Sequence, residues 1–178
     1  LILSESYYPL DHQLASIYHK KAEVYIFQKQ YAQAKQAINK AIDYYSKDFS
    51  PDNMLTSYAL LNSINLIDSD YEQGIQIANQ AEALLDKTNL PHQEMQYLMY
   101  TSLIFNLTGR FDRSQKYIAR MAELAQETNN KRYYVLLEVV KMHAFYVQNK
   151  FVEAYNHANT IKTTLENNYL PEEMALIY

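Results

Sequence analysis

The sequence predicts an all-α protein made of stacked helical hairpins, and three observations lead to this prediction. The chain of 178 residues is 48% apolar but holds only 2 glycines and 4 prolines, which favours helices joined by short loops over a β-protein with many tight turns. One motif returns every 40 residues. Between the motifs, apolar residues recur at the three- and four-residue steps of an amphipathic helix.

The returning motif is an aromatic residue followed three places later by a small residue. Its aromatic positions are Tyr31, Tyr71, Phe111 and Phe151, and its small positions are Ala34, Gly74, Ser114 and Ala154. Four apolar columns keep the same period, and we expect all of them to lie in the core. They are Val24, Ile64, Ile104 and Ala144; Phe27, Ile67, Leu107 and Val147; Ile38, Ala78, Ile118 and Ala158; and Ala41, Ala81, Met121 and Ile161. The period predicts tandem structural repeats.

The first repeat shows how each hairpin is built. Apolar residues at helical spacing predict helices over 11–29 and 32–47. Tyr31 opens the second helix and is expected to fill the gap at the tight turn. Ala34 follows one turn later, where the two helices cross, and a small side chain there lets the helix axes approach to about 8–9 Å.

The later repeats follow the same plan. Their predicted helices are 52–69, 72–87, 92–109, 112–128, 132–149 and 152–167. Proline is tolerated in the first turn of a helix, and it marks the starts of first helices at Pro51, Pro91 and Pro171. Asparagine readily adopts the left-handed conformation that ends a helix, and it stands where second helices should end, at Asn89, Asn129 and Asn168.

These residues resemble the tetratricopeptide repeat. In that family the first helix carries an aromatic, a small and a second aromatic residue, and the second helix opens with aromatic-x-x-Ala and continues with apolar and Ala positions. The first repeat matches with Tyr18, Ala22, Tyr25, Tyr31, Ala34, Ile38 and Ala41. The later repeats match more loosely, and the period of 40 exceeds the usual length of about 34, as in a longer variety found in bacterial regulators. The resemblance implies a right-handed α-solenoid of stacked antiparallel hairpins, a superhelix.

We expect one repeat domain over residues 1–178. Its repeats span approximately 11–50, 51–90, 91–130 and 131–170, with partial repeats at 1–10 and 171–178. Because the chain begins in the phase of a second helix and stops in that of a first helix, it is interpreted as a fragment of a longer protein. Apolar residues near the uncapped ends are expected to allow homo-oligomers: Ile2, Leu3, Met174, Leu176 and Ile177.

Composition and motifs argue against several functional classes. The net charge is −4 and the basic residues form no cluster, so direct nucleic-acid binding is not expected. Without cysteine there is no disulfide, thiolate or Cys-based zinc chemistry. No known catalytic or nucleotide-binding motif occurs, and no serine or threonine has an evident base, so we expect no enzyme activity, cofactor or metal. No apolar run approaches the roughly 20 residues of a membrane span.

The histidines also give no metal or catalytic site. His19 and His143 belong to first helices three repeats apart, too far to share a metal. His19 and Glu23 are interpreted as an i,i+4 polar pair on an exposed face, with a ligand contact or a pH-sensitive group as the alternative. No role is assigned to His12, His92 or His157.

The resemblance places a binding surface on the concave face of the first helices, at positions spaced i, i+3, i+7 and i+10. These are Ser16, His19, Glu23, Ile26; Thr56, Ala59, Ser63, Leu66; Gln96, Met99, Leu103, Asn106; and Leu136, Val139, His143, Tyr146. The family's clamp of Lys, Asn and Arg for a peptide's terminal carboxylate is absent. Because the face becomes apolar in the last two repeats, contact is expected to centre on Met99, Leu103, Asn106, Val139, His143 and Tyr146, with His19 and Glu23 at the polar end. Alternatively, another solenoid turn or another domain of the parent chain buries this face.

The leading functional hypothesis is a non-catalytic module that binds a protein or peptide segment. By analogy with the longer-period family members, it would be the sensor or interaction region of a larger bacterial signalling or transcription-regulatory protein. A cytoplasmic location is expected, with a periplasmic sensor region as the alternative. The second hypothesis is a structural spacer or dimerisation arm with no ligand in its groove, and the third, a catalytic domain, is disfavoured.

Overall fold

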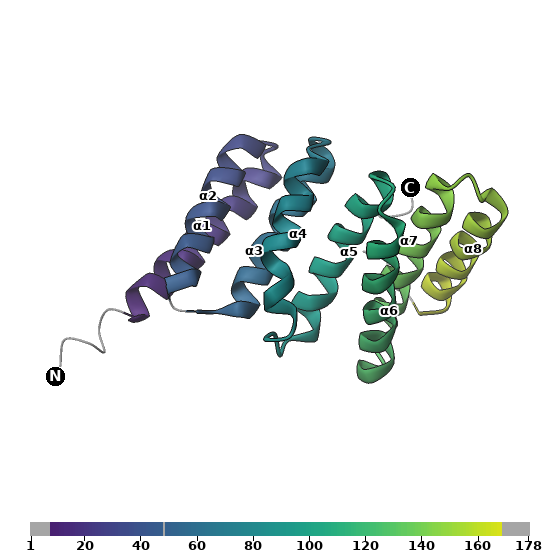
Figure 1. The fold of residues 1–178 in the computed structure, drawn as a ribbon. Helices are drawn as coiled ribbons and strands as arrows, with labels where there is room; N and C mark the ends of the chain where they lie inside the picture. The colour runs from purple at the N-terminus through teal and green to yellow at the C-terminus, as the bar shows by residue number, and fades with distance from the viewer. Residues whose placement is uncertain (1–7, 48, 169–178) are drawn as a thin grey trace. The chain divides into compact units, whose positions relative to one another are not determined.

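The computed structural model describes residues 8–47 and 49–168, which form eight α-helices (Figure 1). The helices are α1 (Tyr8–Phe27), α2 (Tyr31–Lys47), α3 (Pro51–Ile67), α4 (Tyr71–Leu85), α5 (Pro91–Leu107), α6 (Phe111–Thr128), α7 (Lys131–Val147) and α8 (Phe151–Asn168). These residues include no β-strand. The all-helical prediction is confirmed, and the largest boundary difference is three residues, at the start of α1, which was predicted at residue 11 and begins at Tyr8.

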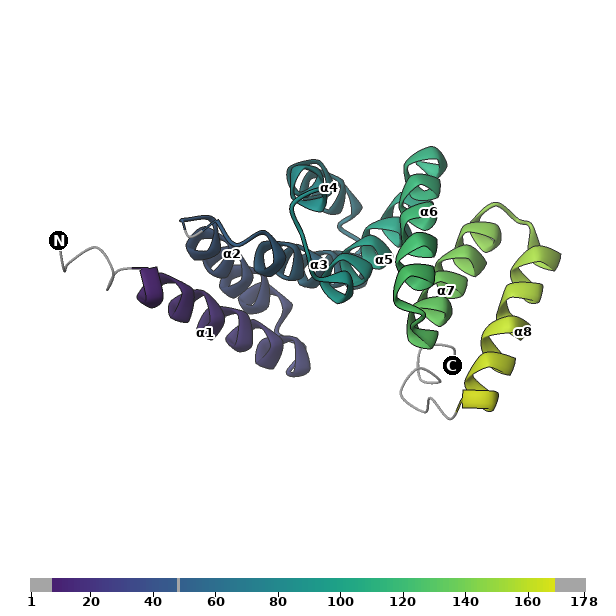
Figure 2. The same cartoon turned by 90° about the horizontal axis from the view of Figure 1, so that it is seen from below.

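The chain divides into two compact units, Leu1–Tyr97 and Leu98–Tyr178, with the boundary inside α5. In the first unit, α1 packs on α2, α2 on α3 and α3 on α4. In the second unit, α6 packs on α7 and α7 on α8. Figure 2 shows the same neighbours from below. Within each unit these helices thus pack on helices next to them in sequence.

The turn inside each hairpin has the same backbone conformation in all four repeats. Its central residue has a positive φ angle, which is 58° at Lys29, 58° at Ser69, 70° at Gly109 and 59° at Asn149. The next N–H then donates to a carbonyl five residues back, in the pairs Gln30–Tyr25, Asp70–Asn65, Arg110–Phe105 and Lys150–Phe145. This is the bond of the Schellman motif, which satisfies a carbonyl at the helix end. The 40-residue period of the sequence is therefore also a period of the backbone.

The structure confirms some of the predicted helix-end residues and contradicts one. Pro51 and Pro91 begin α3 and α5 as predicted, and Asn129 is the left-handed C-cap of α6. The prediction for Asn89 is wrong because α4 already ends at Leu85. Instead, the N–H of Asn89 donates to the Asp52 carboxylate of α3 at 3.1 Å, and the Thr88 hydroxyl donates to the same oxygen.

The last two predicted helix-end residues are Asn168 and Pro171. Asn168 is the last residue of α8. Pro171 and the apolar end residues Ile2, Leu3, Met174, Leu176 and Ile177 lie outside the described residues.

The core predictions hold for some columns and fail for others. The small-residue column that starts at Ala34 is buried in all four repeats, and so is the column that starts at Ala41. The prediction for the Phe27 column is wrong, since Phe27 is 90% exposed and Ile67 and Leu107 are exposed as well. These residues end their helices directly before the left-handed turn, where the chain reverses and leaves the side chain in solvent.

The residues of the Val24 column differ in exposure from repeat to repeat. Ile64 and Ile104 are 0% exposed, whereas Val24 is 55% exposed. Ile17 is likewise exposed, while Ser57, Tyr97 and Leu137 are buried one, two and three repeats later. The outward face of α1 therefore shows apolar side chains at positions that are covered in the following repeats.

Candidate functional site

His19 lies in the interior of the first unit, so the prediction of an exposed His19–Glu23 pair is wrong for the histidine. His19 is 9% exposed, and its Nδ1 is 3.1 Å from Ser57 Oγ of α3. Its Nε2 is 3.5 Å from Glu23 Oε1, while Glu23 also accepts from Lys20 at 2.8 Å. Burial lowers the pKa of His19, and the charge of Glu23 offsets this only in part. His19 therefore joins α1 to α3 through Ser57.

The six residues predicted to form the binding centre all belong to the second unit, but they differ in exposure. Met99 and Asn106 of α5 are buried, and Leu103 is partly exposed. On α7, Val139 packs against the core cluster of Val135, Ile161 and Leu165. His143 is partly buried, and Tyr146 is 61% exposed. Tyr146 is therefore the exposed member of the predicted set, and Leu103, Val139 and His143 are partly exposed.

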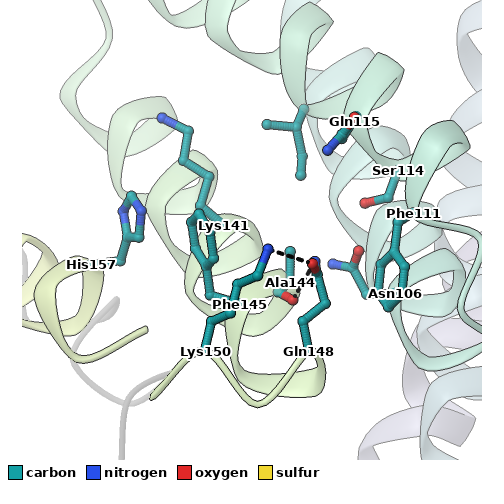
Figure 3. Close-up of a pocket in the computed structure, with 11 residues that line it drawn as sticks. Asn106, Phe111, Ser114, Gln115, Lys141, Ala144, Phe145, Gln148, Lys150 and His157 are labelled. Carbon is teal, nitrogen blue, oxygen red and sulfur yellow. Dashed lines mark hydrogen bonds between the residues drawn. The ribbon is translucent and has the colours of Figure 1, made fainter. Parts of the chain in front are cut away.

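A cavity of about 300 Å³ lies between α6 and α7. We call it the α6–α7 cavity; it is lined by Asn106, Phe111, Ser114, Gln115, Ile118, Lys141, Ala144, Phe145, Gln148, Lys150 and His157 (Figure 3). Its walls are mainly apolar, with polar groups at the edges. Ala144 contributes to the space, because it stands in the column where Ile64 and Ile104 are fully buried and lacks three carbon atoms that isoleucine has.

Asn106 is the polar group that the α6–α7 cavity leaves unsatisfied. Its side chain is 2% exposed, and neither its amide nitrogen nor its carbonyl oxygen has a hydrogen-bond partner among the described residues. In Figure 3 the amide points into the cavity. Nearby groups are engaged, since Ser114 Oγ donates to the Ser102 carbonyl at 3.4 Å and Gln148 Nε2 donates to the Ala144 carbonyl at 2.9 Å. An unpaired buried amide costs about 1–3 kcal/mol, so an occupant that satisfies it gains affinity.

Glu138 of α7 binds two of the three basic groups at the edge of the α6–α7 cavity. It accepts from Lys141 Nζ at 2.9 Å and from His157 Nδ1 of α8. Burial opposes the charge of Glu138, but these two hydrogen bonds outweigh burial and hold its pKa below the usual value. The third basic group, the Lys150 ammonium, donates to Gln148 Oε1 at 3.0 Å and has no carboxylate partner in the described part of the chain.

A second cavity of about 290 Å³ lies between α7 and α8. Its lining residues are Met142, His143, Tyr146, Phe151, Ala154, Tyr155 and Ala158. Five of these, from Tyr146 to Ala158, are the 40-residue equivalents of Asn106, Phe111, Ser114, Gln115 and Ile118, which line the α6–α7 cavity. Burial lowers the pKa of His143, and its Nδ1 has no hydrogen-bond partner among the described residues. Both faces of α7 therefore offer apolar recesses.

Sequence reasoning found some of these residues and missed others. Asn106, His143 and Tyr146 were predicted as binding residues, and the structure places Asn106 in one cavity and the other two in the second. His157, to which no role was assigned, lines the α6–α7 cavity, as do Gln148 and Lys150. The one available signal was Ala144, a small residue in a column that otherwise holds valine and isoleucine.

No group of three or more His, Asp or Glu side chains that could hold a metal occurs within residues 8–47 and 49–168. Over the same residues, no helix combines the length and the apolarity that crossing a bilayer requires. Comparisons with protein-family models, curated proteins and solved structures found no match.

Proposed function

We propose that this chain is a non-catalytic module that binds a protein or peptide segment on a surface of its second unit that α5, α6 and α7 form and that includes the cavity between α7 and α8. The observation that carries the proposal is the buried Asn106 amide, which has no partner among the described residues and points into an apolar cavity. Such a combination of apolar walls with a few directed polar groups is typical of ligand sites.

The wider setting follows from the tetratricopeptide resemblance. The hairpins are proposed to stack as a right-handed α-solenoid with the first helices α1, α3, α5 and α7 on the concave side. The recurring left-handed turn supports tandem repeats, because it joins the two helices of each hairpin in the same way. We place the chain in a larger cytoplasmic regulatory protein of bacterial type, whose other domains are further candidate partners, and expect no direct contact with nucleic acid.

A pull-down with the immobilised chain tests the binding proposal. Leu103→Asp introduces a charge at a partly exposed position of the binding surface, and Tyr146→Asp introduces one at an exposed position. Both variants should abolish partner capture. Val139 is unsuitable for this test because it packs against the core. Val152→Asp is the matched control, since Val152 is 72% exposed on α8 and lines neither cavity. If both test variants keep their circular dichroism spectrum and still capture every partner that the control captures, the proposal is wrong.

A second candidate function, a spacer or dimerisation arm, is favoured by the outward face of α1. Ile17 and Val24 are exposed there at positions that are buried in α3 and α5. A second copy could cover them, as a preceding repeat would. Sedimentation of the protein and of an Ile17→Glu/Val24→Glu variant separates the two functions. A dimerisation arm requires a concentration-dependent dimer that the double variant lacks. A binding module alone predicts that the protein and the double variant sediment in the same way.

A further inference from the structure

We infer that the α6–α7 cavity is the anchor site for an acidic peptide segment: an apolar side chain enters the cavity, the adjoining peptide unit pairs with the Asn106 amide, and a neighbouring Asp or Glu side chain binds the Lys150 ammonium. The inference rests on the proposed function and adds the ligand class and the place of contact. It follows from three features, which are the bonding capacity of Asn106, the size of the cavity and the charge at its edge.

The bonding capacity of Asn106 selects a peptide unit. An asparagine amide offers two N–H donors and one carbonyl acceptor. A peptide unit has a carbonyl and an N–H of its own, so peptide groups can satisfy both sides of the Asn106 amide. An anion would only accept hydrogen bonds and would leave the Asn106 carbonyl unpaired, and a hydrocarbon would leave both sides unpaired. Since both sides are free of partners among the described residues, the peptide is the better match.

The size and lining of the cavity select a single apolar side chain. At about 300 Å³ the cavity lies at the lower end of the range of about 300–1,000 Å³ for ligand sites. Phe111, Ile118, Ala144 and Phe145 give it apolar walls. A leucine-sized side chain would fill the volume that Ala144 leaves open, and the pairing with Asn106 would take place beside it.

The charge at the edge selects an acidic neighbour. Glu138 already binds Lys141 and His157, so these two basic groups have a carboxylate partner within the chain. Lys150 lies over the ring of Phe145 at 5.8 Å and has only a neutral hydrogen-bond acceptor, Gln148, at 3.0 Å. A ligand carboxylate would replace this with a charge-assisted bond. A basic ligand residue would meet an uncompensated like charge.

Short capped peptides test the inference in the full chain. The probes are acetyl-Leu-Asp-amide, acetyl-Leu-Asn-amide, acetyl-Ala-Asp-amide, acetyl-Leu-Lys-amide and acetyl-leucine, titrated to millimolar concentration while the side-chain amide resonances of Asn106 are followed by NMR. Acetyl-Leu-Asp-amide should shift these resonances and bind about 2–5-fold more tightly than its Asn analogue, as expected for one partly exposed ion pair. The Ala and Lys probes should bind more weakly still.

Variants show whether the probe occupies the α6–α7 cavity. Ala144→Ile restores the side chain found at the two preceding positions of the column, and it should abolish binding without lowering the melting temperature. Asn106→Leu should also abolish binding, which in this variant is followed through the side-chain amide resonances of Gln148. Lys150→Gln should remove the preference for Asp over Asn. Lys116→Gln is the matched control, because Lys116 is exposed on α6 and does not line the cavity; it should keep the preference.

Several results would overturn the inference. They are unshifted Asn106 resonances, undiminished binding to a folded Ala144→Ile variant, a preference for the Lys probe, or binding of acetyl-leucine alone, which would indicate a terminal carboxylate as the ligand. The pull-down separates this inference from the proposed function. A partner that is lost with Tyr146→Asp but kept with Asn106→Leu would overturn the anchor site and leave the binding module in place.

Discussion

The left-handed turn residues allow two substitutions whose effects should have opposite signs. Gly109 has φ of 70°, and a Cβ atom built there meets nothing within 4 Å. Gly109→Ala therefore introduces no clash, and its effect is set by the backbone alone. A non-glycine residue in this conformation costs about 1–2 kcal/mol. Alanine has less conformational entropy than glycine in the unfolded chain, and this offsets the cost by about 0.4–1 kcal/mol. We expect a net loss of about 0.5–1 kcal/mol.

Ser69 occupies the equivalent turn one repeat earlier, with φ of 58°. By the same reasoning, Ser69→Gly should increase the free energy of unfolding by about 0.5–1 kcal/mol. Urea denaturation measures both changes, which should appear in the midpoint with an unchanged slope. Gln76→Gly is the control, since Gln76 is exposed within α4 and glycine there should destabilise by about 1 kcal/mol. If Ser69→Gly destabilises as much as this control does, the repeated left-handed turn is not the conformation in solution.

Three further predictions concern the packing, the polar contacts and the pH dependence of the fold. Ala34→Leu should destabilise by about 1–3 kcal/mol because the site is fully buried, and an unchanged urea midpoint would contradict tight packing there. Ala154→Leu should destabilise less, because Ala154 is buried but lines the cavity between α7 and α8. Gly74→Ala, at the equivalent helical site, should be neutral or stabilise by up to about 1 kcal/mol. Asp52→Ala removes the acceptor of the Thr88 hydroxyl and the Asn89 N–H and should cost about 1–2 kcal/mol of stability, measured by thermal melting. The isosteric Asp52→Asn variant keeps one acceptor oxygen and should lose only part of that stability. Burial lowers the pKa of His19 and His143, so the unfolded chain binds more protons than the folded chain just below pH of about 6.5. Stability should therefore fall as the pH drops from 7 towards 5. The melting temperature of His143→Gln should fall less steeply over this window, and a slope equal to that of the parent protein would argue against the burial of His143.

The helices could be predicted from the sequence because their signals are local and recur four times. Pro51 and Pro91 set helix starts through their own ring geometry, and the small-residue column sets a close packing position in every repeat. Phe27 was misjudged because hydrophobicity alone does not say whether a neighbouring element covers a helix end. Asn89 was misjudged because a contact across the loop, with Asp52, determines where the chain goes after α4.

The candidate site was predictable only in outline. The concave spacing pointed to Asn106, His143 and Tyr146, but it gave no sign that Asn106 is buried without a partner. That property depends on the side chains contributed by α6, α7 and α8 together, Ala144 among them. The role of His157 depends on its contact with Glu138, 19 residues away on the neighbouring helix. Such packing between helices leaves no periodic trace in one sequence.

Site-specific photo-crosslinking tests most directly whether the surface formed by α5, α6 and α7, with the cavity between α7 and α8, takes up a protein or peptide segment. p-Benzoylphenylalanine is placed at Tyr146 in one version of the protein and at Val152 in another, and each is irradiated in an extract of the source cells. Both positions are exposed, at 61% and 72%, but only Tyr146 lines a cavity. We expect a discrete adduct from position 146 that disappears when Leu103→Asp is added, and none from position 152. Equal adducts from both positions, or an adduct from position 152 alone, would contradict the claim.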